Sequence, residues 1–232
     1  MGQTDARVLT GPAIRDAASV IVVRDAAGTP SVLMGQRGHS AAFMPSKYVF
    51  PGGAVDPGDA AVPLARGPNA TCAARLGLRG DCPAGALAAA AIRELWEETG
   101  QVAGIAGDWP DAPPDWARFA ATGHRPDAQS LSYMFRAVTP PGRPRRFDAR
   151  FFVMPAEALA SDPDDFDAAT DELGHLHWVD LRRARALDLP FITSVVLGEV
   201  EDRLPDLSPP ARVPYFRNDT AWAVLNDAAP PG

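Results

Sequence analysis

Apolar residues along the chain fall into short runs that are separated by turn-forming residues. The β-branched run 19–24 and the apolar run 31–35 flank a turn-like segment, 25–30, and therefore predict a β-hairpin. Further strands are predicted at residues 48–50, 130–138, 149–154 and 176–179. Strands interleaved with a few helices predict a layered α/β or α+β fold.

The clearest predicted helix spans residues 84–99. The Asp-Cys-Pro segment at 81–83 supplies a capping residue and an early proline, and Gly100 suits the left-handed position that follows a helix. Residues 56–80 are dense in Gly, Pro, Asn and Asp and predict a long loop, and the chain from Pro205 onward is predicted to be irregular. Shorter helices are predicted at 113–122 and 191–204, and another is predicted to begin at Asp180.

Three carboxylates share one face of the predicted helix. At about 100° per residue, Glu94, Glu97 and Glu98 occupy an arc of about 100°. Like charges at this spacing repel, and a hard divalent cation would balance them, because Mg²⁺ binds carboxylate oxygens together with substrate phosphates. The alternative is an ordinary solvated acidic face. Under the first interpretation, this acidic face is expected to be exposed and to meet the cation.

The same helix carries a longer motif. Residues 93–100, RELWEETG, resemble the second half of the Nudix box, GX5EX7REUXEEXGU, and Gly53 through Asp59 resembles its first half, with Asp59 in place of Glu. The spacer between Asp59 and Arg93 has 33 residues instead of seven, and Gln101 stands where an apolar residue is expected. The long spacer leaves open whether Asp56, Asp59 or neither partners Arg93.

The split box resembles one branch of this superfamily, the branch of the peroxisomal coenzyme A diphosphatases. The segments 43–46 and 49–53 carry the likeness before the insertion, and the whole resemblance covers roughly residues 17–200. It implies a Nudix-type α/β/α sandwich with a mixed sheet and a long insertion, about 60–83, inside the box. We expect a single domain at 17–204, between a tail at 1–16 and a C-terminal extension at 205–232. The likeness continues at 139–140, 145–152, 171–173, 178 and 187–190.

The resemblance implies hydrolysis of a diphosphate linked to another moiety, with Mg²⁺ or Mn²⁺ as cofactor. It implies that Glu94, Glu97, Glu98 and the backbone carbonyl of Gly53 hold the metal, and that Arg93 orients the glutamates. Glu94 would instead deprotonate water if it is not a ligand. Outside the box, Glu172 is the candidate for an added metal ligand or general base.

The predicted substrate is a small nucleotide-type diphosphate, with coenzyme A or acyl-CoA as the first candidate. ADP-ribose, a dinucleotide or a nucleotide sugar is the alternative, and a non-catalytic Nudix-like ligand-binding module is the alternative of another class. Basic side chains that would meet substrate phosphates are Arg37, Lys47, Arg145 and Arg146.

The composition of the chain limits the binding partners and the location that we expect for the protein. The net charge of −7 argues against a broad basic face for nucleic acid. No run approaches the roughly 18 apolar residues of a membrane span, and the polar N-terminus lacks the apolar core of a signal peptide, so we expect a cytoplasmic protein. Cys72 and Cys82 are expected to be free thiols or a local disulfide and lack a zinc-site pattern. A homodimer is left open.

Overall fold

A mixed β-sheet forms the centre of the protein. The computed structural model describes residues 12–39, 44–78, 80–217 and 223–225. In this part of the chain the main sheet has the order β11-β10-β7-β8-β1-β2-β3, with β4 paired to β1 and β9 paired to β2. The strands are β1 (Ile14–Arg24), β2 (Ser31–Arg37), β3 (Tyr48–Val49), β4 (Gly52–Ala54), β7 (Ser132–Val138), β8 (Arg146–Pro155), β9 (Leu173–Asp180), β10 (Val213–Arg217) and β11 (Ala223–Leu225).

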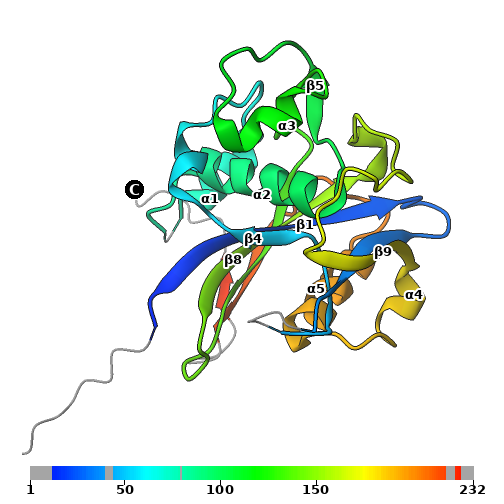
Figure 1. Cartoon of the computed structure of the whole chain (residues 1–232). Helices are drawn as coiled ribbons and strands as arrows, with labels where there is room; N and C mark the ends of the chain where they lie inside the picture. The colour runs from blue at the N-terminus through cyan, green and yellow to red at the C-terminus, as the bar shows by residue number, and fades with distance from the viewer. Residues whose placement is uncertain (1–11, 40–43, 79, 218–222, 226–232) are drawn as a thin grey trace, which may run out of the picture.

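Helices cover both faces of this sheet (Figure 1), so the predicted three-layer α/β/α architecture is confirmed. One face carries α1 (Ala70–Leu76), α2 (Ala84–Thr99) and α3 (Ala117–Ala120). The other face carries α4 (Leu181–Ala184) and α5 (Phe191–Glu201). Short 3-10 helices lie at η1 (Pro57–Ala61), η2 (Pro114–Trp116) and η3 (Ala156–Ala158), and β5 (Gly104–Ala106) pairs with β6 (His124–Pro126) in a separate small sheet.

The alternation of apolar residues along β1 supplies both cores. Val20 and Val22 pack in the core beneath α2, whereas Ile21 and Val23 pack in the core beneath α5. This division follows from the two-residue period of a strand. The predicted hairpin is confirmed, since β1 and β2 are antiparallel, and β8 runs parallel to β1 along its length. Both strands that flank β1 therefore hold it at the centre of the sheet.

Helix α2 has the bounds that its sequence predicts. It ends at Gly100, whose φ of 73° is left-handed, as expected. Its buried alanines, 88–91, let the helix lie close against β1 and β4. Only the cap differs from the prediction, because Pro83 is the residue that precedes the helix and no side chain, Asp81 included, caps its first turn.

The predicted loop at 56–80 is wrong in part, because it contains η1 and α1. The Asn69 side chain accepts a hydrogen bond from the backbone N–H of Cys72 at 2.9 Å and starts α1. Cys72 and Leu76 then lie one turn apart and are fully buried against the sheet. The insertion is therefore part of the core. Both cysteines are free thiols, one of the two predicted alternatives.

The predicted irregular C-terminus also contains regular structure. β10 lies parallel to β7, and its Val213 and Tyr215 side chains are buried in the core beneath α2. The prolines around β10 obscure the alternation of buried and exposed residues in its sequence. Because β10 and β11 join the main sheet, the sheet continues beyond residue 204. None of the described helices is long and apolar enough to cross a membrane.

Candidate active site

The site forms where the C-terminal half of α2 approaches β4. Pairing of Gly52 with Ser19, and of Gly53 with Ala18, fixes β4 on β1 beside the helix. A Cβ atom on Gly52 would lie 2.5 Å from the carbonyl oxygen of Ala18, and one on Gly53 would collide with the Glu94 carboxylate. Glycine at position 52 therefore permits the close pairing of β4 with β1, and a side chain at position 53 would displace the Glu94 carboxylate.

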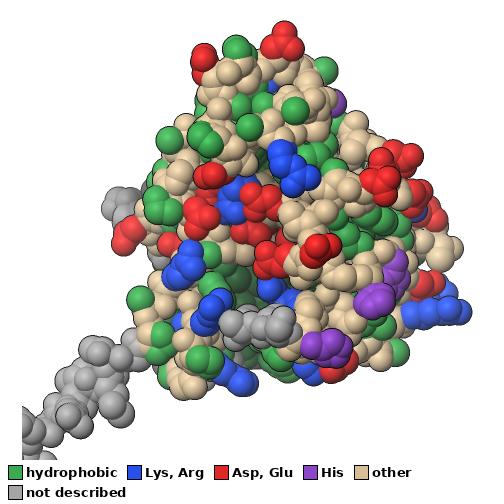
Figure 2. Space-filling model, viewed as in Figure 1, with side chains coloured by type: hydrophobic (Ala, Val, Ile, Leu, Met, Phe, Trp, Pro, Cys, Tyr) green, Lys and Arg blue, Asp and Glu red, His purple; other side chains and the backbone are tan. Residues whose placement is uncertain are grey.

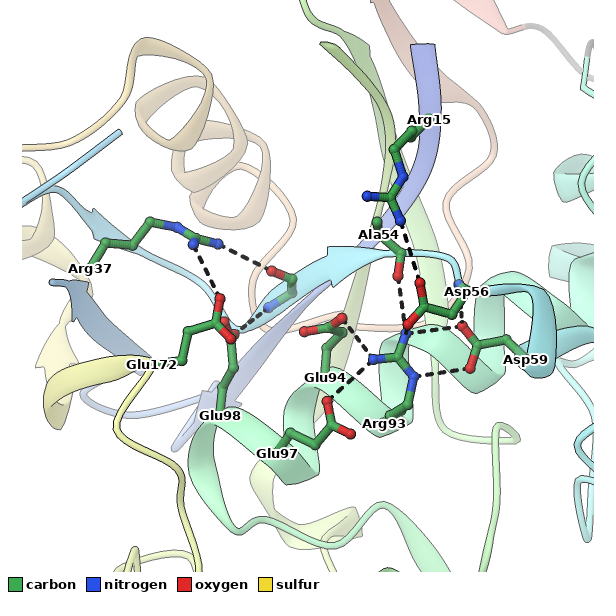
Figure 3. Close-up of polar contacts among 11 residues, drawn as sticks. Arg15, Arg37, Ala54, Asp56, Asp59, Arg93, Glu94, Glu97, Glu98 and Glu172 are labelled. Carbon is green, nitrogen blue, oxygen red and sulfur yellow. Dashed lines mark hydrogen bonds and ion pairs between the residues drawn. The ribbon is translucent and has the colours of Figure 1, made fainter. Parts of the chain in front are cut away.

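Arg93 is the centre of the polar network (Figure 3). Its Nε and Nη2 atoms donate to the two carboxylate oxygens of Asp59, each at 3.0 Å. Nη1 donates to Glu94 at 2.9 Å and to Glu97 at 3.2 Å. Nη2 also donates to the backbone carbonyl of Ala54 on β4, at 3.0 Å. One buried guanidinium thus joins both halves of the split box and orients two of the three glutamates.

Asp59 is the main carboxylate partner of Arg93, a point that the long spacer leaves open in the sequence. Its side chain is almost completely buried, and its Oδ2 atom also accepts from the Asp56 backbone N–H at 2.8 Å, which fixes it at the start of η1. Asp56 lies farther from Arg93, at 3.7 Å, and pairs with Arg15 at 3.4 Å. Asp59 therefore makes the bidentate contact with the box arginine despite 33 intervening residues.

The three glutamates do not share one exposed face, which corrects the expectation from the helical wheel. The exposed fraction of the side chain is 38% for Glu97 and 12% for Glu94, and Glu98 is fully buried. Glu98 Oε2 accepts from the backbone N–H of Gly52 at 2.7 Å, whereas Oε1 has no partner within the described residues. β4 covers Glu98, and sequence periodicity cannot report the position of that strand.

Burial also raises the pKa values of these carboxyl groups. Desolvation raises the pKa of Glu94 to about 7, although the charge of Arg93 opposes the change. It raises the pKa of Glu97 as well, and it raises that of Glu98 well above the usual value, with the nearby Glu94 charge adding to the effect. Burial alone would lower the pKa of Arg93, but its hydrogen bonds to Asp59 and the surrounding carboxylates raise it. Around Arg93 and Arg37, the described carboxyl groups therefore outnumber the guanidinium groups that pair with them.

Glu172 lies at the edge of this network, just before β9. Its Oε1 atom is 3.5 Å from Arg37 Nη1, and Arg37 Nη2 donates to the carbonyl oxygen of Gly52 at 3.4 Å. Glu172 also raises the pKa values of Glu94 and Glu98 through its charge. The structure thus brings two predicted residues, Glu172 and Arg37, to the same place as the box glutamates (Figure 3).

Comparisons with known proteins agree with this arrangement. No family model matches the chain. The chain is 31% identical over 179 residues to a Caenorhabditis elegans protein named "Putative nudix hydrolase 7", across 72% of this chain and 51% of that protein. It therefore spans about half the length of this curated relative. A solved Nudix hydrolase from Alicyclobacillus acidocaldarius superposes with a TM-score of 0.61 at 28% identity, over 85% of this chain and 98% of that one.

The chain is therefore similar to Nudix hydrolases in both sequence and fold. Within the described residues, however, no three Asp, Glu, His or Cys side chains converge as a preformed metal site. Glu94 and Glu97 are hydrogen-bonded to Arg93 instead. The donor chemistry nevertheless fits a divalent cation, because Glu98 presents an unpartnered buried oxygen and Glu94 lies against the backbone of Gly53.

Of the other predicted basic residues, Arg145 and Arg146 lie apart from the glutamates of the motif, whereas the backbone carbonyl of Lys47 accepts from the N–H of Arg37 at 3.0 Å. Lys47 forms an ion pair with Asp188. Arg146 pairs with Ile14 on β1, five residues before Ser19, the partner of Gly52, which corresponds to roughly 16 Å along a strand. Arg145 precedes Arg146 in the β7–β8 turn. The structure therefore does not bring Arg145 and Arg146 to the site, because the parallel register of β8 carries them away from it.

Two depressions flank the exposed side of the Nudix helix, and acidic side chains gather around basic ones on this face (Figure 2). They have volumes of about 330 and 220 Å³ and share Glu97 and Asp115. Asp115, which lies in η2, is not predicted from the sequence as a lining residue, because an isolated acidic residue in a proline-rich segment belongs to no motif. The smaller depression is also lined by Asp56, Asp59, Arg93 and Trp116.

Proposed function

We propose that the protein is a metal-dependent hydrolase that cleaves the diphosphate linkage of a nucleotide-type substrate. The single observation that carries this proposal is the surplus of carboxylate around Arg93, including the unpartnered buried oxygen of Glu98. Burying carboxylates without matching cations costs free energy. A site that binds divalent cations with an anionic substrate accounts for that cost.

Glu94, Glu97, Glu98 and the carbonyl of Gly53 would hold Mg²⁺ or Mn²⁺, both of which prefer oxygen ligands. When bound, such ions neutralise phosphate charge and lower the pKa of coordinated water. Arg93 would keep its contact with Asp59 and so hold the Nudix helix against η1 and β4. Its hydrogen bonds to Glu94 and Glu97 would limit the positions available to these carboxylates.

Glu172 and Glu94 are the candidates for accepting a proton from the attacking water. The raised pKa of Glu94, about 7, is suited to proton transfer near neutral pH. Glu172 is exposed, and its neighbour Arg37 would meet a substrate phosphate on the same side. We favour Glu94 as a metal ligand and Glu172 as the base, because Glu94 lies against Gly53 whereas Glu172 extends from the opposite wall.

Two substrate classes follow from this proposal. Coenzyme A and acyl-CoA are favoured by the likeness to the split-box branch. ADP-ribose, dinucleotides and nucleotide sugars form the alternative, and they do not need Arg145 or Arg146 to bind a 3′-phosphate.

The test is a panel of diphosphates incubated with Mg²⁺ and with Mn²⁺, with products separated by chromatography. Coenzyme A would give 3′,5′-ADP and phosphopantetheine, and ADP-ribose would give AMP and ribose 5-phosphate. Removal of the metal with a chelator should abolish turnover, and p-nitrophenyl phosphate should remain intact. Binding of these ligands without any cleavage, by folded protein with metal present, would instead identify a non-catalytic module.

A further inference from the structure

The larger depression, of about 330 Å³, adjoins the glutamates but is built mainly from other segments. Its volume falls at the lower end of about 300–1,000 Å³, the range of small-ligand pockets. Glu97, a candidate metal ligand, and Glu172, the candidate base, form the side next to the proposed metal site. The lining residues are Trp96, Glu97, Asp115, Arg118, Thr170 and Glu172.

Asp115 and Arg118 remain available to a ligand in this depression. Neither forms an ion pair with any described residue, although they are three positions apart in the η2–α3 segment. Arg118 Nη2 donates to the backbone carbonyl of Ala168 at 3.2 Å, which restrains the guanidinium without neutralising it. A carboxylate acceptor and a guanidinium donor are therefore presented side by side.

The backbone that carries these two side chains is anchored in the core. Trp116 and Phe119 are buried, and their ring centroids are 5.3 Å apart. Phe119 also contacts Trp96 of α2, with centroids 5.8 Å apart. Because the exposed polar residues alternate with these anchors, their positions relative to α2 are fixed before a ligand binds, which favours specific recognition.

The charge of the depression selects the ligand group. Asp115 and Arg118 are the charged lining residues that the proposed metal site does not use, because Glu97 is a candidate metal ligand and Glu172 the candidate base. One carboxylate beside one guanidinium leaves no surplus of positive charge for a phosphate. This pair favours vicinal hydroxyl groups, which donate to carboxylates and accept from a guanidinium. An acidic side chain that accepts from a ribose hydroxyl is an established mode of nucleotide recognition.

We propose that this depression binds the 2′,3′-diol of a ribosyl group, with Asp115 accepting from the hydroxyls and Arg118 donating to one of them. The inference rests on the proposed diphosphatase function and narrows its substrates. A substrate with a free diol, such as ADP-ribose or a dinucleotide, fits this subsite, whereas the 3′-phosphate of coenzyme A would face the Asp115 carboxylate.

The test compares P1,P2-di(adenosine-5′) diphosphate with its 2′,3′-dideoxy counterpart in the presence of Mg²⁺. We expect the wild-type protein to favour the ribo substrate at least about tenfold in kcat/KM, because a site built to bond a hydroxyl rejects the analogue that lacks it. Asp115→Ala should raise KM for the ribo substrate about tenfold, leave kcat within about twofold and leave the dideoxy substrate unaffected. Asp115→Asn should restore part of the preference.

Asp111→Ala is the matched control, since Asp111 is an exposed acidic residue of the same segment outside both depressions. Equal rates for the two substrates in the wild type, or an unchanged preference in Asp115→Ala, would overturn the diol subsite while the diphosphatase function stands. Absence of cleavage of either substrate, and of every diphosphate in the wider panel, would overturn both proposals.

Discussion

Two clusters of charged side chains, each containing at least one buried arginine, lie on the same side of the sheet and differ in charge balance. In the first, Arg15, Arg37 and Arg93 lie among six carboxylates (Figure 3). In the second, Arg136 and Arg150 meet two carboxylates, Asp148 and Asp16. The six carboxylates of the first cluster are Asp56, Asp59, Glu94, Glu97, Glu98 and Glu172.

The balanced cluster has a structural explanation within the chain. Asp148 accepts from Arg136 Nε at 2.8 Å and from Nη2 at 2.6 Å, and Arg136 Nη1 donates to the carbonyl of Leu78 at 3.1 Å. Arg136 on β7 therefore links the insertion, through Leu78, to Asp148 on β8. The carboxylates of the unbalanced cluster outnumber its arginines, and this difference supports the proposal that the Arg93 cluster binds an external cation.

Replacing the buried carboxylate of the unbalanced cluster should have the largest effect. Glu98→Gln keeps the shape and the acceptor for Gly52 N–H but removes the charge. We expect a loss of kcat on the order of 10²–10⁴-fold with the fold retained, because a metal ligand is lost. Product formation at saturating Mg²⁺ measures the effect, and circular dichroism checks the fold. Wild-type turnover in this variant would remove Glu98 from the proposed site.

Breaking the balanced cluster should affect stability instead. Asp148→Ala leaves Arg136 and Arg150 with one carboxylate between them, and both arginines are almost fully buried. The expected loss is about 3–5 kcal/mol in the free energy of unfolding, measured by urea denaturation. Asp148→Asn is the milder variant if the alanine protein does not fold. A large fall in kcat of the folded protein, without a loss of stability, would contradict this division of roles.

The pH dependence of metal-free protein sharpens the comparison further. Burial raises the pKa of Glu94 to about 7 and that of Glu98 well above normal, so the folded state binds more protons than the unfolded state. The contribution of these groups to stability is complete below about pH 4.5 and is lost as pH rises through their folded-state pKa values. We therefore expect this contribution to fall between about pH 5 and 8.

Thermal unfolding across this range, with and without Mg²⁺, measures that change. The difference between wild type and Glu98→Gln cancels the groups that both proteins share, and it should grow in favour of the variant as pH rises. Saturating Mg²⁺ should reduce the difference, because the ion replaces the proton. A pH-independent difference would show that Glu98 has the same protonation state in the folded and unfolded protein.

The sequence predicts helix α2 better than its surroundings, for physical reasons. α2 is long, ends at a glycine with left-handed φ, and carries its glutamates at fixed helical spacing. Its three-layer setting follows from the alternation in β1 and from the family resemblance. The burial of Glu98 and the absence of Arg145 and Arg146 from the site depend on the positions of β4 and β8, which arise from long-range pairing. Local patterns do not contain that information.

A substitution in the insertion has the smallest expected effect on stability. It tests whether a segment predicted to be a loop contains a helix that stabilises the fold. Asn69→Ala removes the hydrogen bond to Cys72 N–H that starts α1, which should cost about 1 kcal/mol and lower the Tm by roughly 2–4 °C while kcat/KM stays unchanged. Thr71→Ala is the control, because this exposed residue of the first turn is not the cap. Equal Tm values for the two variants would mean that α1 adds nothing to stability, and that the insertion behaves as the loop its composition predicts. A lower Tm for Asn69→Ala alone would show that a seven-residue helix within the split box supports the sheet on which α2 rests.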